Sequence, residues 1–307
     1  MTNISNTLNN ILGVSINITK MILSIVLYLL ISIGLLYVFA NYIQSYGYEA
    51  FPNIKKIILN EGNHFGLHNR PEIDDSNTID TSIMMIIFPI AWWIWAKLTK
   101  FKWEPVVEKP PYKIMLLGVV APFIIMLVGV FIEIVFENNR TIYLAENLYR
   151  AFNIGASAAA LEEVLDRGLL IGIPYYFFIL KYNKQHLTIP LVVLGGFIFG
   201  IMHMTNHSTI DSNMLLASLQ SVMAFVGGVS YGLLYIVTGK LRYSIAVHFV
   251  YNFLCSFYIF NNEWTPPMQD FSILETALTN SLILICDALM GYFLYKIWKE
   301  NRKKPAR

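Results

Sequence analysis

Long apolar stretches alternate with short polar connections along most of the chain. A helix needs about 20 apolar residues to cross the roughly 30 Å hydrocarbon core of a bilayer. Stretches of sufficient length fall at about 20–44, 81–98, 113–136, 150–180, 188–207, 213–238, 243–261 and 272–298. The pattern predicts an all-α, multi-pass membrane protein with about eight transmembrane helices.

The amino-acid composition agrees with a membrane protein. Hydrophobic residues make up 56% of the 307 residues and charged residues only 14%, whereas a soluble domain carries about 25% charged residues. The net charge is only +2, and the sequence has no basic stripe with interleaved aromatic residues. We therefore expect membrane lipid, and no nucleic acid, among the partners; the sequence leaves the oligomeric state open.

Two parts can be distinguished along the chain. Residues 1–112 hold the first two expected spans and a long polar loop at 45–80. Residues 113–307 hold the remaining spans, which short connections join, and form the expected membrane core. No soluble domain is indicated in either part.

Lysine and arginine are distributed unevenly among the connections between spans. They gather at 97–113, 181–184, 240–242 and 296–307, whereas the connections at 206–212 and 262–271 contain none. Cytoplasmic connections are the ones enriched in these residues. Eight spans with both termini in the cytoplasm satisfy this distribution.

The fourth expected span contains a dense group of charges, in Leu-Glu-Glu-Val-Leu-Asp-Arg-Gly at 161–168. Glu163 and Arg167 are four residues apart with the acid first, which is the order that favours an ion pair on a helix. Glu162 points about 100° away around the helix, so its carboxylate is free to act as a general base. The alternative is a solvated run of charges at the wet end of a span.

Two other spans carry polar residues that can join this group. His203 ends the fifth span, and His248 and Asn252 lie four residues apart in the seventh span, hence on one face of a helix. Such residues either form hydrogen bonds between helices or belong to a polar site with Glu162.

The remaining polar residues of the spans are interpreted more simply. Glu133 and Asp287, single acids in the third and eighth spans, are expected to be isolated structural contacts. Cys255 and Cys286 lie in apolar stretches without metal or redox spacing, which indicates small buried hydrophobic residues. His207 either joins the polar site or faces a loop.

Depth in the membrane decides whether the polar residues can meet. Glu162 and His203 are each nineteen residues from the nearest lysine, which places both about 28 Å from the lysine-rich face. His248 would lie roughly 20 Å shallower on straight helices. It can meet them if the 238–242 hairpin lies inside the protein, or if the fourth span breaks near residues 172–174.

Three motifs follow one another on separate expected spans: Glu162-Glu163-x-x-x-Arg167-Gly168, Phe199-x-x-x-His203 and His248-x-x-x-Asn252. In spacing and order they resemble the CAAX protease and bacteriocin-processing (CPBP, or Abi) family of intramembrane endopeptidases. The resemblance covers about 145–260. One departure is Asp166, because the residue before the arginine is often aromatic in that family.

The resemblance implies an endopeptidase of the glutamate type that hydrolyses a peptide bond inside the membrane, in a buried polar cavity. The expected catalytic residues are Glu162, His203, His248 and Asn252, and the expected supporting residues are Glu163 and Arg167. Glu162, helped by His203, would activate a water molecule, while the other two catalytic residues would stabilise the oxyanion.

A cofactor is not required by this mechanism, although a divalent metal is an alternative. Glu162, His203 and His248 would then be its ligands. The spacing lacks the sequence His-Glu-x-x-His, and no cysteine is available for a metal centre.

The expected substrate is a small peptide precursor or a lipid-anchored peptide, in peptide maturation or bacteriocin self-immunity. The expected location is a bacterial plasma membrane. A second class of function is a catalytically silent membrane scaffold or regulator of the same fold. A transporter is disfavoured, because the chain lacks corresponding halves with interrupted helices.

Overall fold

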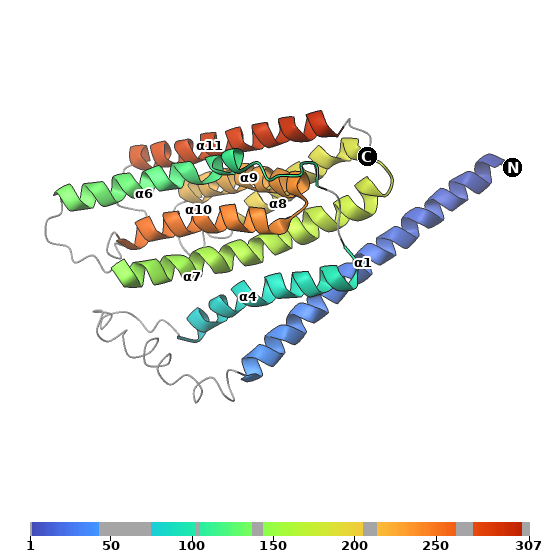
Figure 1. Ribbon diagram of the computed structural model, residues 1–307, viewed down its shortest axis with the longest axis horizontal. Coiled ribbons are helices and arrows are strands. Elements are labelled where there is room, and N and C mark those ends of the chain that lie inside the picture. Colours follow the sequence, from blue (N-terminus) through green and yellow to red (C-terminus); the bar gives the residue numbers. More distant parts are fainter. Residues whose placement is uncertain are drawn as a thin grey trace.

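The computed structural model describes residues 2–42, 75–101, 105–136, 144–204, 214–261 and 273–302, and their regular elements are all helices. The helices lie side by side, and α1 leans out from one edge of the bundle (Figure 1). In chain order they are α1 (Thr2–Tyr42), α4 (Asp75–Leu98), α5 (Tyr112–Met115), α6 (Leu117–Phe136), α7 (Leu144–Glu162), η3 (Glu163–Gly172), η4 (Tyr175–Leu180), η5 (Gln185–Leu187), α8 (Thr188–Met204), α9 (Met214–Thr238), α10 (Leu241–Asn261) and α11 (Ile273–Asn301).

Each apolar stretch of the sequence overlaps a helix, so the prediction of an all-helical protein is confirmed. Within the described residues, four helical segments are long and apolar enough to cross a membrane: Gly13–Leu35, Gln185–Met204, Ala217–Thr238 and Asn280–Asn301. The number of about eight spans and the division at residue 112 stay predictions. Most of the polar loop at 45–80 lies outside the described residues.

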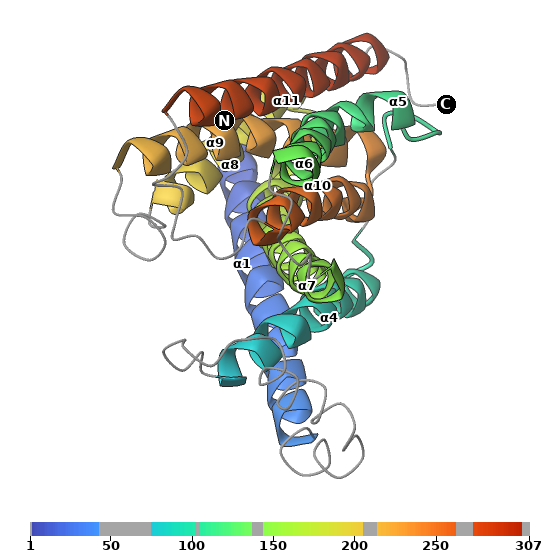
Figure 2. The ribbon, with the colours of Figure 1, turned by 90° about the vertical axis from the view of Figure 1, so that its left-hand side faces the viewer.

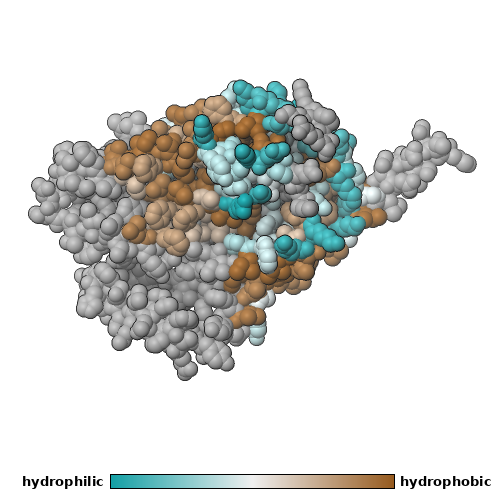
Figure 3. Space-filling view, in the orientation of Figure 1, coloured by the Kyte–Doolittle hydropathy of each residue, from teal (hydrophilic) through white to brown (hydrophobic). Residues whose placement is uncertain are grey.

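The helices alternate in direction, and their lysines and arginines gather at one end of the bundle. α4, α9 and α11 end on the side where α8 and α10 begin (Figure 1). On the face that Figure 3 shows, hydrophilic residues lie toward the same end, and apolar side chains cover much of the rest of the coloured surface. We name this the cationic end; its exposed members are Lys97, Lys100, Lys109, Lys113, Lys181, Lys184, Lys240, Arg242, Lys296, Lys299 and Arg302.

The turn between α9 and α10 is partly covered by another segment of the chain, while Lys240 and Arg242 stay exposed. The backbone amides of Val106 and Val107 donate to the carbonyl oxygen of Val237, at 2.9 Å and 3.3 Å, so the segment before α5 covers the end of α9. Leu241, the first residue of α10, is buried. Gly239 makes the turn with a φ of 65°, a conformation that glycine adopts without steric cost. The hairpin is thus covered on one side, by residues 106–107, and its cationic side chains remain at the surface.

The fourth span does not break near residues 172–174, which was the other arrangement considered. Ile173 and Pro174 keep right-handed helical dihedral angles, so α7, η3 and η4 form one continuous helix. Residues 163–172 and 175–180 are wound as π-helix, which places more residues in each turn than an α-helix does. Such i→i+5 winding is rare and occurs frequently at functional sites.

η3 lies at the centre of the bundle, where it packs against α4, α8, α9 and α10. Figure 2 shows the preceding helix, α7, between α4 and α10. The position of η3 therefore brings its charged residues within reach of polar side chains on the neighbouring helices.

α8 and α9 approach each other closely at glycines. A Cβ atom on Gly196 would lie 2.9 Å from the backbone nitrogen of Val229, and one on Gly228 would lie 2.9 Å from the Cα atom of Gly196. Only small residues allow such an approach of two backbones. The contact fixes α8, which carries Phe199 and His203, against α9.

Candidate active site

His248 of α10 lies next to two consecutive glutamates at the junction of α7 and η3. Its Nδ1 is 2.8 Å from Oε1 of Glu163, and its Nε2 is 3.6 Å from Oε2 of Glu162. The side chain of Glu163 is fully buried, whereas that of Glu162 is 31% exposed. The packing of α10 against the junction of α7 and η3 thus brings together two motifs that are far apart in the sequence.

The contact with Glu163 determines which nitrogen of His248 carries a proton. An ionised carboxylate only accepts hydrogen bonds, so the Nδ1–H group of His248 donates to Glu163. In a neutral imidazole the other nitrogen then has no proton. Nε2 therefore presents a lone pair toward Glu162.

Arg167 neutralises Glu163 from within η3. Its Nε is 3.3 Å from Oε2 of Glu163, and its Nη1 is 2.9 Å from Oδ2 of Asp166. The ion pair between Glu163 and Arg167 that the four-residue spacing predicted is present, and both side chains are fully buried. Because Asp166 also faces Arg167, the guanidinium has two carboxylate neighbours.

Two aromatic rings enclose Arg167 and His248. The guanidinium carbon of Arg167 is 4.4 Å from the ring centroid of Phe199 and 5.5 Å from that of Tyr231. The imidazole of His248 is 6.2 Å and 5.3 Å from the same two rings. These contacts fix the two nitrogen-containing side chains relative to each other.

Sequence reasoning did not identify Tyr231. It is 3% exposed and lies in an apolar span, where a tyrosine hydroxyl usually has a polar partner. A tyrosine three residues after the Gly227-Gly228 pair, which marks a close helix contact, was the signal that could have found it.

His203 contacts Phe199 rather than Glu162. Its Nδ1 is 2.9 Å from the backbone carbonyl oxygen of Phe199 and donates to it, and the two ring centroids are 4.5 Å apart. Among the described residues, Glu162 forms its close histidine contact with His248 and makes no ion pair with His203. The sequence paired Glu162 with His203, so the structure places a different imidazole beside this carboxylate.

Asn252 lies one helical turn beyond His248 on α10 and is half-buried. The backbone of α10 touches α7 at this level, since a Cβ atom on Gly155 would lie 2.9 Å from the backbone nitrogen of Phe253. Asn252 thus lies on the helix that carries His248, one turn farther along it. Its catalytic role stays a prediction.

The donor set considered for a metal is not assembled. Within the described part of the chain, no three His, Cys, Asp or Glu side chains are grouped so that they could hold a metal ion. Glu162 and His248 are neighbours, but His203 is turned to the carbonyl oxygen of Phe199. We therefore derive no step through a metal.

Three other polar residues were noted in the sequence, and one of them has a described side chain. Asp287 is buried in α11. The side chain of Glu133 and the whole of His207 lie outside the described residues.

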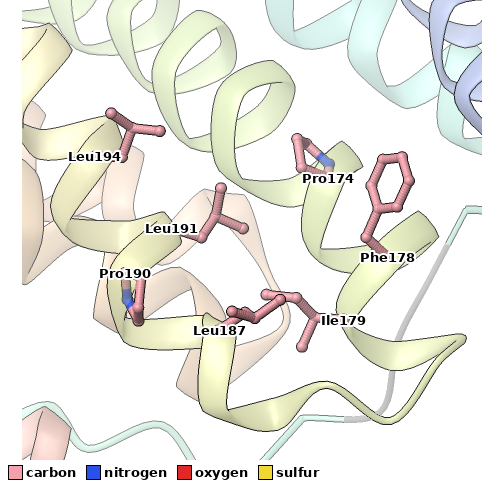
Figure 4. Close-up of a pocket in the computed structure, with 7 residues that line it drawn as sticks. All are labelled: Pro174, Phe178, Ile179, Leu187, Pro190, Leu191 and Leu194. Carbon is pink, nitrogen blue, oxygen red and sulfur yellow. The ribbon is translucent and has the colours of Figure 1, made fainter.

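An apolar pocket of about 250 Å³ lies between η4 and α8. Pro174 and Phe178 line one wall, and Leu191 and Leu194 line the other (Figure 4). The pocket lies toward the cationic end, and none of its lining residues belongs to the Glu162–His248 group.

Residues 144–254 match the model of a family described as Rce1-like, type II CAAX prenyl endopeptidase Rce1-like. This segment is similar to the CAAX prenyl endopeptidases that the family describes. The Rce1-like segment runs from the start of α7 into α10 and contains all six residues expected in the site. The match confirms the family resemblance and supports a CAAX-type intramembrane protease, which is a hydrolase. Comparisons with curated proteins and with solved structures gave no match.

Proposed function

We propose that this protein is an intramembrane endopeptidase in which Glu162 and His248 together activate a water molecule. The observation that carries the proposal is the 3.6 Å separation of Oε2 of Glu162 from Nε2 of His248. This separation is too long for a direct hydrogen bond, and both atoms accept when Glu162 is ionised and His248 is neutral. A water molecule that donates one hydrogen to each atom satisfies both.

Glu162 is the general base in the proposed reaction. It takes a proton from the bound water as the oxygen attacks the carbonyl carbon of the peptide bond. The proton then passes to the leaving amine as the C–N bond breaks, which leaves a carboxylic acid and an amine as products. His248, held by Glu163, stabilises the shared proton during this transfer.

His203 and Asn252 assist this step in our proposal. The amide of Asn252 donates to the oxyanion that forms on the carbonyl oxygen. His203 has its Nδ1–H group engaged with Phe199, so its Nε2 is available to accept a proton. Glu163 and Arg167 maintain the position of His248, since a catalytic group needs support from residues that are themselves fixed.

The proposed substrate is a lipid-anchored peptide or a small peptide precursor in the bilayer. The description of the matched family, a CAAX prenyl endopeptidase, supports the first of these. Peptide maturation and bacteriocin self-immunity are the two proposed roles. The apolar exposed surfaces of the helices support an integral membrane location, and we propose a bacterial plasma membrane.

Cleavage by the purified protein tests the proposal. The probes are two fluorogenic peptides of one sequence, with and without a prenylated cysteine near the C-terminus, in liposomes that contain the protein. We expect wild-type protein to cleave at least one peptide, and Glu162→Gln to lower the rate at least 100-fold, since a general base contributes about 100- to 10,000-fold.

The matched control is Glu300→Gln, because Glu300 is an exposed acid on α11 near the cationic end. This variant should cleave like wild type. Normal cleavage by Glu162→Gln would contradict the proposal and favour a non-enzymatic scaffold.

A further inference from the structure

Asp287 of α11 is a buried acid near the candidate active site that the proposed reaction does not use. It is 4% exposed and lies in a segment long and apolar enough to cross a membrane. Within the described part of the chain, its carboxylate forms no ion pair and no hydrogen bond. Acids inside a membrane are costly and usually mark a site or a pair. The position of Asp287 therefore needs a physical reason.

The absent side chain of Gly227 provides the space for this carboxylate. A Cβ atom on Gly227 would lie 3.3 Å from Oδ2 of Asp287 and 3.9 Å from Cε2 of Tyr231. The acid of α11 and the ring of α9 thus meet at the same glycine. Nearby, the hydroxyl of Ser230 donates to the backbone carbonyl oxygen of Asp287 at 2.7 Å, which holds α11 against α9.

Tyr231 connects this acid to the candidate active site. Its ring centroid is 5.3 Å from that of His248, with 33° between the ring planes. The hydroxyl of Ser244, on α10, donates to the backbone carbonyl oxygen of Tyr231 at 3.0 Å, so the tyrosine is anchored to the helix that carries His248. Asp287 lies near enough to His248 and Tyr231 for its charge to act on both side chains.

We infer that Tyr231 and Asp287 are positioning residues of the active site. The ring of Tyr231 packs against His248 and keeps its imidazole turned toward the two glutamates. Asp287 supports this ring and, as a carboxylate, stabilises the partial positive charge on His248 while Glu162 holds the proton from water and shares it with that imidazole. That proton later passes to the leaving amine, so the charge exists only during the reaction. The inference rests on the proposed function.

The first test is the Asp287→Asn variant of the full chain, with the cleaved fluorogenic peptide in liposomes. Asparagine keeps the shape of the side chain and removes its charge. We expect kcat to fall about tenfold to thirtyfold with KM unchanged. This factor corresponds to the lost attraction between two opposite charges that one aromatic ring separates, at an effective dielectric constant of about 20. A purely structural contact would not change kcat in this selective way.

The matched control is Ser230→Ala, which removes the neighbouring hydrogen bond between α9 and α11 but leaves both positioning side chains in place. Its kcat and KM should equal those of wild type. A wild-type kcat in Asp287→Asn, or an equal loss in Ser230→Ala, would overturn the role of Asp287.

The second test does not depend on turnover. The chain has six histidines, so nitrogen-15 labelling of histidine gives few solid-state NMR signals in bilayers, and loss of one in His248→Gln assigns His248. We expect a single neutral form with the proton on Nδ1 in wild type and in Tyr231→Phe, which keeps the ring. Tyr231→Leu should give a mixture of the two tautomers.

Each outcome of the two tests has a defined meaning. An unchanged tautomer of His248 in folded Tyr231→Leu would overturn the role of Tyr231. If Tyr231→Leu does not fold, Tyr231→Phe decides, and a mixture of tautomers in that variant would overturn the role. If wild-type protein cleaves no peptide, the proposed function fails. The NMR signals of His248 then test the role of Asp287. A shift of these signals in Asp287→Asn, with no shift in Ser230→Ala, supports the role, and any other result overturns it.

Discussion

At the scale of single residues, two glutamates that follow one another in the sequence occupy different surroundings. Glu163 is fully buried and has Arg167 and His248 as neighbours of its two oxygens. Glu162 is partly exposed and faces Nε2 of His248. This difference is the basis for our proposal that Glu163 supports the site and that Glu162 is the general base.

The sequence predicted part of this arrangement. The pairing of Glu163 with Arg167 follows from their four-residue spacing on one helix, and it is present. The proximity of Glu162 to His248 could not be deduced, because it depends on the depth of α10. Hydropathy gives no information on that depth, because neither the covered side of the hairpin nor the π-helical winding has a hydropathy signal.

Arg167 should be required for folding. Arg167→Leu leaves two buried acids without their cation, and breaking one side of a buried ion pair costs about 3–5 kcal/mol. We expect a clearly lower midpoint of thermal unfolding in detergent and less folded protein. Arg242→Leu is the control, because Arg242 is exposed on α10 and a surface substitution changes stability by about 0.5 kcal/mol or less. Normal melting of Arg167→Leu with a selective loss of rate would instead give Arg167 a chemical role.

At the scale of helices, apolar stretches predicted most of the boundaries. The expected spans at 188–207 and 243–261 correspond to Thr188–Met204 and Leu241–Asn261. α1 is the clear exception, because it begins at Thr2 whereas its apolar stretch begins after Lys20. Hydropathy detects the part of a helix that lies in hydrocarbon and gives no information on a polar helical extension.

The contact between α8 and α9 should tolerate no added methyl group. In Gly196→Ala the new Cβ atom would lie 2.9 Å from a backbone nitrogen of α9, so the two helices must separate. Overpacking of this kind costs about 1–3 kcal/mol, and we expect a lower midpoint of thermal unfolding. Gly34→Ala is the matched control, since nothing lies within 4 Å of the added atom and alanine favours a helix. Equal melting of the two variants would show that the close contact does not contribute to stability.

At the scale of the whole molecule, the cationic end defines a direction across the membrane. Its lysines and arginines lie where successive helices meet, and Glu108 and Glu300 are exposed acids near the same end. The positive-inside rule assigns such an end to the cytoplasm. The Glu162–His248 group lies farther along the helices, toward the opposite side.

Reporter fusions in a bacterial host should establish this orientation. We expect a fluorescent protein fused after Arg307 to be bright and alkaline phosphatase at the same position to be inactive, because the C-terminus is predicted to be cytoplasmic. A phosphatase fused within 262–271, in the connection without lysine or arginine, should be active. The opposite result at both positions would reverse the predicted topology.

The central claim is that Glu162 and His248 act as one unit, and a double-mutant cycle on peptide hydrolysis tests it most directly. The rate is measured for wild type, Glu162→Gln, His248→Ala and the double variant, with the folded fraction of each determined in parallel. Parts of one catalytic unit are not additive, so we predict that the double variant is no slower than the slower single variant, with all four proteins folded. Losses that multiply in the double variant, or near-normal hydrolysis by Glu162→Gln, would contradict the account.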